Sequence, residues 1–329
     1  MTIAAGKIEK ALASHGAETI AKGSKSFAIA SLLFGRRMQA DVHMLYAWCR
    51  HCDDVIDGQD LGGDAPDRTL TSEEMQRRLD ELRDKSKLAL SGEQTGDEAF
   101  DGFSIVARRH AMPEKYPIDL LSGFANDVEK RRFESLNDLM EYCYGVAGVV
   151  GIMMAIVMGV DKNNEEILDR ACDLGLAFQL TNICRDVVDD ARGGRVYLPA
   201  DWLAAEGVAA EPEAIIDERN REAVSIVVAK TLEMADEYYA SASEGARHLP
   251  VRAAAAVLAA RNVYRDIGRK VAERGVKAWD RRMVISTPRK LMLAISGAGA
   301  GIYQAAVRRA HPLRPRKNLW RREFMERAS

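Results

Sequence analysis

The 329-residue sequence lacks the features of a secreted, nucleic-acid-binding or phosphate-loop protein. Its five cysteines are an odd number in apolar or helix-like stretches, which argues against a disulfide framework and indicates a reducing compartment. The formal net charge is -2, whereas nucleic-acid-binding proteins usually carry an excess of basic residues, so no nucleic-acid partner is expected. The N-terminal segment has no apolar run typical of a signal peptide. We therefore expect a cytoplasmic protein.

Two short motifs resemble known binding motifs but do not predict a binding site here. Cys49 and Cys52 have C-x-x-C spacing, but no second pair and no preceding strand signal accompany them. Redox or zinc chemistry is therefore not expected there. Gly297, Gly299 and Gly301 follow no recognisable strand, which argues against a dinucleotide-binding fold. The sequence also has no Walker-type phosphate loop.

Strand signals are scarce and helical periodicity is strong. No proline occurs between Pro117 and Pro199. Within that stretch one helix face is predicted from residues three or four apart: Leu168, Cys172, Leu176, Gln179 and Ile183. The sequence thus predicts an all-α protein, with one domain over residues 1–307 and a basic C-terminal tail over 308–329.

Two apolar stretches are long enough to raise the question of a membrane. Tyr142–Val160 is uncharged but rich in glycine and has no basic cluster at either end, which favours a buried core helix. Leu291–Val307 fits either a core helix or a surface-seeking one. The tail that follows it is basic, with Arg314, Arg316, Lys317, Arg321 and Arg322 among its cations.

Two columns of oxygen ligands are the main chemical signal. Asp53 and Asp57 are four residues apart, as are Asn182, Asp186 and Asp190 in succession. On helices each set shares one face, where like charges repel unless a cation neutralises them. Oxygen ligands without histidine or thiolate suit Mg²⁺ or Mn²⁺. The alternative is a pair of solvated acidic helix faces.

A loop rich in polar residues follows each carboxylate cluster. These loops, Gly58–Ser72 and Ala191–Asp201, suit a lidded site, although ordinary helix connectors remain an alternative. Arg50, Arg185 and Arg195 lie beside the carboxylates or in the second loop. Arginines at such a site suit a diphosphate leaving group, whose oxygens gain charge as the C–O bond breaks. Ion pairing with the same aspartates is the competing interpretation.

Four runs of residues resemble the phytoene/squalene synthase family. They are SKSF at Ser24–Phe27, the run Tyr46–Asp57, YCYGVAGVVG at Tyr142–Gly151 and LGLAFQLTNICRDVVDDARGGRVYLP at Leu174–Pro199. The last run is long and specific, and the resemblance extends over most of the chain. The wording CRHCDDVIDG and the later AWDRR are most similar to bacterial phytoene synthases.

The resemblance implies an isoprenoid synthase fold, with helices around a central apolar cavity. It implies catalytic aspartates at Asp53, Asp57, Asp186 and Asp190, which together with Asn182 would be ligands of a Mg²⁺ cluster. It also implies substrate contacts from Ser24, Lys25, Ser26, Phe27, Tyr46, Arg50, Gln179, Arg185, Arg195 and Tyr264. The helix at Tyr142–Val160 would then line a prenyl tunnel.

The implied reaction is the head-to-head condensation of two geranylgeranyl diphosphates through prephytoene diphosphate to phytoene, with release of two diphosphates. Mg²⁺, or Mn²⁺ in its place, is the expected cofactor, and NADPH is not expected. Squalene or dehydrosqualene synthase is an alternative, as is a non-catalytic lipid-binding or assembly member of the family. Because the product is insoluble in water, we expect peripheral contact with the inner face of the membrane.

Overall fold

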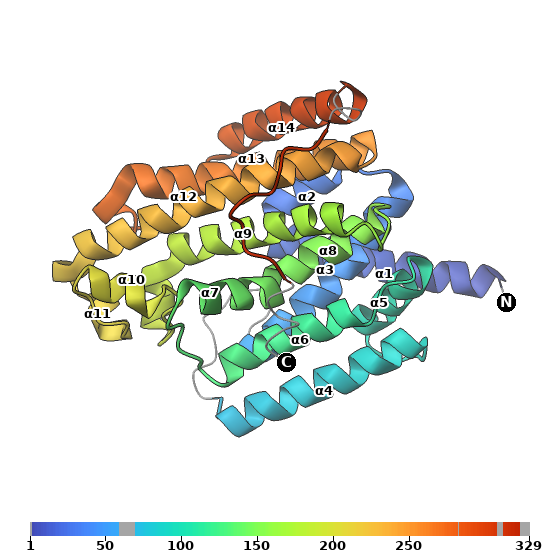
Figure 1. Cartoon of the computed structure of the whole chain (residues 1–329). Coiled ribbons are helices and arrows are strands. Elements are labelled where there is room, and N and C mark those ends of the chain that lie inside the picture. Colours follow the sequence, from blue (N-terminus) through green and yellow to red (C-terminus); the bar gives the residue numbers. More distant parts are fainter. Residues whose placement is uncertain (1, 59–69, 282, 308–311, 323–329) are drawn as a thin grey trace.

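The structure is a computed structural model that describes residues 2–58, 70–281, 283–307 and 312–322. Every regular element within these ranges is helical, which confirms the predicted all-α class (Figure 1). The α-helices are α1 (Thr2–Gly23), α2 (Lys25–Ser31), α3 (Arg36–Asp57), α4 (Ser72–Ser91), α5 (Glu98–Arg109), α6 (Lys115–Val128), α7 (Leu136–Cys143), α8 (Val149–Val157), α9 (Glu165–Arg192), α10 (Ala200–Ala205), α11 (Pro212–Ile216), α12 (Arg221–Gly245), α13 (Val251–Arg274) and α14 (Thr287–Val307). A π-helical turn, η1 (Tyr144–Gly148), joins α7 to α8, and the 3-10 turns are η2 (Glu218–Asn220), η3 (Ala246–His248) and η4 (Gly275–Lys277).

Helix α9 is the central element and packs against α8, α12 and α13. It begins where the Asn164 side chain accepts a hydrogen bond from the Ile167 amide, and acidic residues in its first turn suit the helix dipole. Its 28 residues give a length of about 42 Å. The predicted apolar stripe is confirmed, since Leu168 and Leu176 are fully buried. The helix therefore crosses the whole domain.

The uncharged stretch 142–160 lies within α7, η1 and α8. Leu136–Val157 is long and apolar enough to cross a membrane, but 67% of its most apolar window is buried inside the protein. That burial supports the predicted core helix. A Cβ at Gly151 would lie 2.3 Å from the Ala171 oxygen, and one at Gly175 would lie 2.1 Å from the Ala147 oxygen. These glycines thus bring α8 and η1 against α9.

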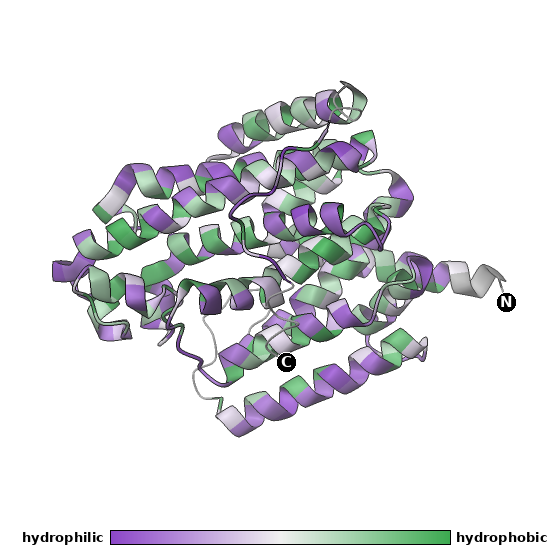
Figure 2. Ribbon diagram, in the orientation of Figure 1, coloured by the Kyte–Doolittle hydropathy of each residue, from purple (hydrophilic) through white to green (hydrophobic). Residues whose placement is uncertain are grey.

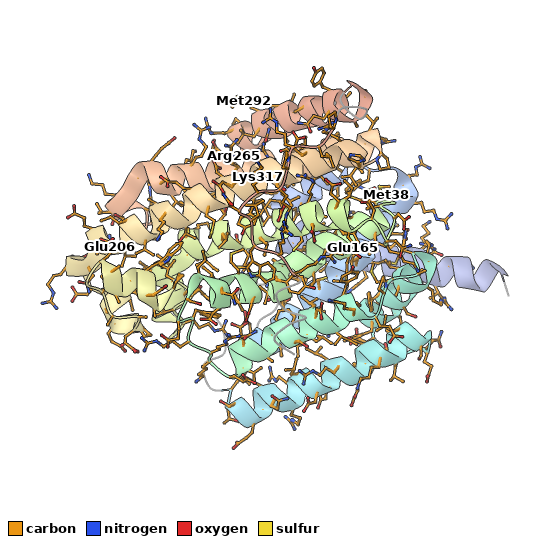
Figure 3. All side chains as sticks on the ribbon, in the orientation of Figure 1. Met38, Glu165, Glu206, Arg265, Met292 and Lys317 are labelled. Atoms are coloured by element: carbon orange, nitrogen blue, oxygen red, sulfur yellow. The ribbon has the colours of Figure 1, made fainter. Side chains whose placement is uncertain are left out.

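Helix α14 lies at the outer edge of the molecule and packs on α13 (Figure 1). Gly297 and Gly301 face the α13 backbone, whereas Leu293 and Ala294 pack only partly against the core. The opposite face is exposed and carries Leu291, Met292, Ile295, Ile302 and Tyr303. Figure 3 labels Met292 on α14, which is the outermost helix in this view. Figure 2 shows the apolar residues of the same helix in green. Helix α14 is therefore a surface helix that packs on α13 by one face rather than a core helix. Whether it contacts a membrane stays a prediction.

The C-terminal segment 312–322 runs back from the α14 edge across α12 and α9 towards α7 (Figure 1). Trp320 is 9% exposed, and Arg316 and Arg322 pair with carboxylates of α9. The predicted basic tail is thus packed on the domain over this range. Residues 308–311, where the tail was predicted to begin, and 323–329 lie outside the described residues.

The α13–α14 contact yields a stability prediction. In Gly301→Ala the new methyl group would lie 2.5 Å from the Ala254 oxygen, so we expect a loss of about 1–3 kcal/mol. Gly299, two residues earlier, has no neighbour within 4 Å, so Gly299→Ala should gain up to about 1 kcal/mol from helix propensity. Urea unfolding of the two variants measures both effects. Equal midpoints would contradict the close backbone contact.

Candidate functional site

A cavity of about 710 Å³ lies at the centre of the helices. Its polar end is formed by Arg50, Asp53 and Asp57 of α3 together with side chains of α9. Most of the rest is apolar, with Val146 and Met154 among the residues of η1 and α8 that line it. The predicted central apolar cavity is therefore present. Asp53 and Asp57 line it, whereas Asp186 and Asp190 of α9 do not.

Helix α3 places Asp53 and Asp57 on one face, as their spacing predicted. The Arg50 guanidinium lies 3.1 Å from Asp53 and 2.5 Å from Asp54. Burial raises the pKa of Asp53 to about 7, against the opposing effect of Arg50. Arg195 reaches across from the loop after α9 and donates to Asp57 at 2.9 Å. The two carboxylates of this column are thus paired with arginines from two elements.

Helix α9 carries the second column. Arg185 binds the neighbouring Asp186 through both Nε, at 2.9 Å, and Nη2. Burial and the charge of Asp186 raise the pKa of Asp190 well above its ordinary value. One turn before Asp186, the Oδ1 atom of Asn182 is buried and has no hydrogen-bond partner among the described residues. A buried carbonyl oxygen without a partner is costly unless a ligand satisfies it.

These donors fit a hard cation such as Mg²⁺. All are carboxylate or amide oxygens, and Asn182, whose Oδ1 atom has no partner among the described residues, lines the same cavity as Asp53. Across the part of the chain that the structure describes, no three His, Cys, Asp or Glu side chains come close enough together to hold a metal ion. The arginine pairs occupy the carboxylates instead, as the competing interpretation anticipated. The ligand set remains a prediction.

Four aromatic side chains border the polar end. The Phe27 ring stacks on Tyr264 at 5.2 Å, and Phe178 lies 4.4 Å from Tyr264. Tyr46 meets the edge of Phe27 at 6.4 Å. Burial raises the pKa of the Tyr264 phenol. This aromatic cluster is therefore neutral and able to stabilise a cation by its ring faces.

Most of the predicted substrate-contacting residues line the cavity: Ser24, Phe27, Tyr46, Arg50, Gln179, Arg185 and Tyr264. Lys25 is exposed, and Ser26 is half-buried but does not line the cavity. Arg195 reaches the site through Asp57 rather than through the cavity wall. The loop predicted at Gly58–Ser72 falls almost wholly outside the described residues. The second predicted loop is ordered and supplies Arg195 and Tyr197.

The sequence analysis missed Asp127 and Phe178. Asp127 of α6 accepts hydrogen bonds from Tyr142 at 3.2 Å and Tyr197 at 3.0 Å, and Arg195 is 3.9 Å away. Burial raises the pKa of Asp127 to about 6. It is a lone acid near a helix end, so no spacing could identify it. Phe178 directly precedes Gln179 in the longest signature run, which was a usable signal.

Comparisons with known proteins agree over nearly the whole chain. The family model described as squalene/phytoene synthase matches residues 20–289. The chain is 49% identical over 311 residues to a 15-cis-phytoene synthase of Pantoea ananas, covering 94% of this chain and 98% of that protein. It is 48% identical to a 15-cis-phytoene synthase of Enterobacter agglomerans, covering 91% and 98%.

A solved structure shares the architecture as well. A dehydrosqualene synthase in complex with a ligand superposes with a TM-score of 0.77 at 25% identity, covering 88% of this chain and 96% of the other. The helices that carry the two carboxylate columns lie within the region matched by the family model. The chain therefore belongs to the squalene/phytoene synthase family.

Proposed function

We propose that the protein is a phytoene synthase that joins two geranylgeranyl diphosphates head to head. The observation that carries this proposal is the apolar cavity, whose polar end is lined by Asp53, Asp57 and Asn182 together with Arg50 and Arg185. Asp186 and Arg195 adjoin that end through their pairs with Arg185 and Asp57. The chain matches relatives named phytoene synthase over nearly their whole length, which supports the choice of substrate. A prenyl diphosphate has the same division into a charged head and an apolar chain.

The arginines are suited to hold the diphosphate groups. Arg50, Arg185 and Arg195 are each paired with a carboxylate of the site in this structure. If Asp53, Asp57, Asn182, Asp186 and Asp190 hold Mg²⁺, the metal supplies Lewis-acid stabilisation of the leaving diphosphate. The guanidinium groups would then turn from the carboxylates to the phosphate oxygens. They stabilise the charge that develops there as the C–O bond breaks.

The aromatic cluster is suited to the other product of ionisation. Loss of diphosphate leaves an allylic cation, and the faces of Phe27, Phe178 and Tyr264 offer it electrostatic stabilisation without a nucleophile. The double bond of the second substrate attacks this cation, loses a proton and closes the cyclopropane ring of prephytoene diphosphate. The surrounding apolar walls exclude water, which would otherwise capture the cation.

The second half of the reaction ends in loss of a proton. Prephytoene diphosphate loses its diphosphate, the carbon skeleton rearranges, and deprotonation gives phytoene. Tyr264 is a neutral phenol with a raised pKa, which makes it a poor base in its ground state. Released diphosphate, held by the arginines beside the cation, is the better proton acceptor in this proposal.

Dehydrosqualene or squalene synthase is the alternative within the family, and the 0.77 TM-score to a dehydrosqualene synthase keeps it in view. Those enzymes use a shorter chain, so product length separates them from a phytoene synthase. A non-catalytic lipid-binding member has no need for the two carboxylate columns, whose burial raises the pKa of Asp53 and Asp190. The columns therefore argue against it.

We further propose that the enzyme contacts the membrane through α14. Its product is a hydrocarbon, and each CH₂ group that enters water costs about 0.8 kcal/mol, so the product must pass into lipid. The exposed face of α14 offers five large apolar side chains on one helix. Lys290 at its start adds a cation for anionic lipid, whereas Arg316 and Arg322 are engaged with carboxylates of α9. The helix, more than the tail, is therefore the proposed contact.

Two variants test the site. Asp53→Ala and Asp186→Ala should each lower phytoene formation by about a hundredfold or more, because transition-state charge loses its support. Both should keep their circular dichroism. The thermal midpoint should change little in Asp53→Ala, because Arg50 still pairs with Asp54, and should fall further in Asp186→Ala, which leaves Arg185 without its paired carboxylate. Asp189→Ala is a matched control, because Asp189 is an exposed neighbour on α9 that pairs with Arg192. Near-normal turnover in either site variant would refute the assignment.

The cofactor is tested by reconstitution. With Mg²⁺ or Mn²⁺ the purified protein should convert geranylgeranyl diphosphate to hydrocarbon without reduced nicotinamide. A reaction whose last step is the loss of a proton consumes no hydride. Chelation by EDTA should stop the reaction, and added Mg²⁺ should restore it. Hydrocarbon release that depends on NADPH would favour the squalene synthase alternative.

The membrane contact is tested on α14 itself. Replacing Ile295 and Ile302, which are 64% and 50% exposed, by asparagine should lower binding to anionic vesicles about tenfold. Ile118→Asn is the control, since Ile118 is similarly exposed on another helix. Co-sedimentation with vesicles of phosphatidylglycerol and phosphatidylcholine gives the measurement. Equal binding by all three proteins would remove α14 from the proposal.

A further inference from the structure

One of the residues that line the cavity is a buried arginine. Arg170 lines the cavity together with Met158, Val160 and Ile167, and its side chain is only 2% exposed. On α9 it lies about 18 Å along the helix axis from Asn182, which is at the polar end. An arginine in the wall of a chamber built for a prenyl chain is unexpected, because apolar side chains would fit that chain better.

Few groups hold this guanidinium, and one belongs to the C-terminal segment. Arg170 donates to the main-chain oxygen of Arg314 at 2.6 Å and to Ser241 at 3.2 Å. Its acidic partner, Glu166, is 3.4 Å away and 63% exposed. Its Nε atom has no hydrogen-bond partner in the ranges described. The shortest of these hydrogen bonds thus depends on where residue 314 lies.

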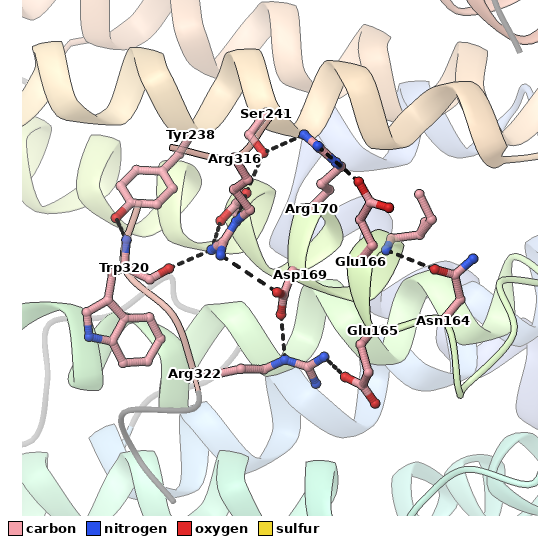
Figure 4. Close-up of polar contacts among 12 residues, drawn as sticks. Asn164, Glu165, Glu166, Asp169, Arg170, Tyr238, Ser241, Arg316, Trp320 and Arg322 are labelled. Atoms are coloured by element: carbon pink, nitrogen blue, oxygen red, sulfur yellow. Dashed lines mark hydrogen bonds and ion pairs between the residues drawn. The ribbon is translucent and has the colours of Figure 1, made fainter. Parts of the chain in front are cut away.

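The position of residue 314 is fixed by ion pairs immediately after it (Figure 4). Arg316 binds Asp173, which is fully buried, through two hydrogen bonds of 2.8 and 2.7 Å. Arg322 binds Asp169 at 2.7 Å. Ser241 donates to Asp173 at 2.6 Å and accepts from Arg170, so it joins the two buried charges. Asp169, Arg170 and Asp173 are all on α9, one turn or less apart.

Trp320 fastens the same segment to α12 and α7. Its amide donates to the Tyr238 hydroxyl at 3.1 Å, and its indole nitrogen donates to Asn137 at 3.0 Å. Its ring lies 5.7 Å from that of Tyr144, the first residue of the π turn η1. Two residues later, Val146 lines the cavity. The segment therefore touches α7, η1, α9 and α12 at once.

We propose that residues 312–322 form a strap that fixes Arg170 as the end wall of the prenyl cavity and so sets the longest chain the enzyme accepts. This inference rests on the proposed function. Arg170 would be the residue that meets the chain end, and Arg316 a positioning residue that acts through Asp173 and the strap. A chain one isoprene unit too long would meet a guanidinium that the strap prevents from moving.

The test compares geranylgeranyl diphosphate with geranylfarnesyl diphosphate, which is one isoprene unit longer. Arg170→Met removes the guanidinium, and Asp173→Asn with Arg316→Met removes the anchor of the strap nearest to residue 314 without leaving a lone buried charge. In both, the kcat/KM ratio of the longer to the shorter substrate should rise about tenfold or more. A general loss of stability would lower both values alike. Arg314→Ala is the control, because it keeps the main-chain oxygen and removes a side chain that is 79% exposed.

A second measurement does not depend on activity. Hydrogen exchange of the first turns of α9 should quicken in the double variant and stay unchanged in Arg314→Ala. If the double variant does not fold, Arg316→Lys, which keeps the charge but loses the two-point contact, should shift both measurements in the same direction by less. An unchanged ratio in folded Arg170→Met and in whichever strap variant folds overturns the inference. If the wild-type enzyme is inactive on geranylgeranyl diphosphate while hydrogen exchange is still faster in the strap variant, the proposed function alone is refuted.

Discussion

The burial of charge next to an apolar chamber is the constraint on which the rest of the structure depends. Carboxylates moved out of water are costly unless cations and hydrogen bonds compensate them. At the polar end Arg50, Arg185 and Arg195 provide that compensation. At the far end Arg316 provides it for Asp173. Both ends of the cavity are therefore defined by arginine and aspartate pairs, with apolar walls between them.

The ion pairs at the two ends of the cavity differ in whether a substrate or a cation can replace one partner. The arginines at the polar end can exchange a carboxylate for a diphosphate, and the carboxylates can exchange an arginine for a cation. The pairs at the far end face α12 and the C-terminal segment, so in the proposed reaction no substrate group replaces them. The same chemistry thus serves an exchangeable site and a permanent one. What separates them is access to the cavity.

The features that could be predicted from the sequence are those whose residues lie close together along the chain. The columns Asp53–Asp57 and Asn182–Asp190 were visible because residues four apart share a helix face. The core helix over 142–160 was visible from its apolar run. Asp127 and the strap were not, because their partners are distant in sequence: Asp127 meets Tyr197, and Arg316 meets Asp173, 143 residues earlier. A basic tail looks the same in sequence whether it pairs with buried acids or with lipid.

The pairing of Arg316 with Asp173 has a consequence for synthesis of the chain. At roughly 5 to 20 residues per second, the 143 residues between them take about 7 to 30 s to translate. During that time α9 can form, but the buried face around Asp173 has no guanidinium from the strap. That face of the nascent domain stays without its buried ion pair until Arg316 has left the ribosome. Completion of this end of the cavity is therefore coupled to synthesis of segment 312–322.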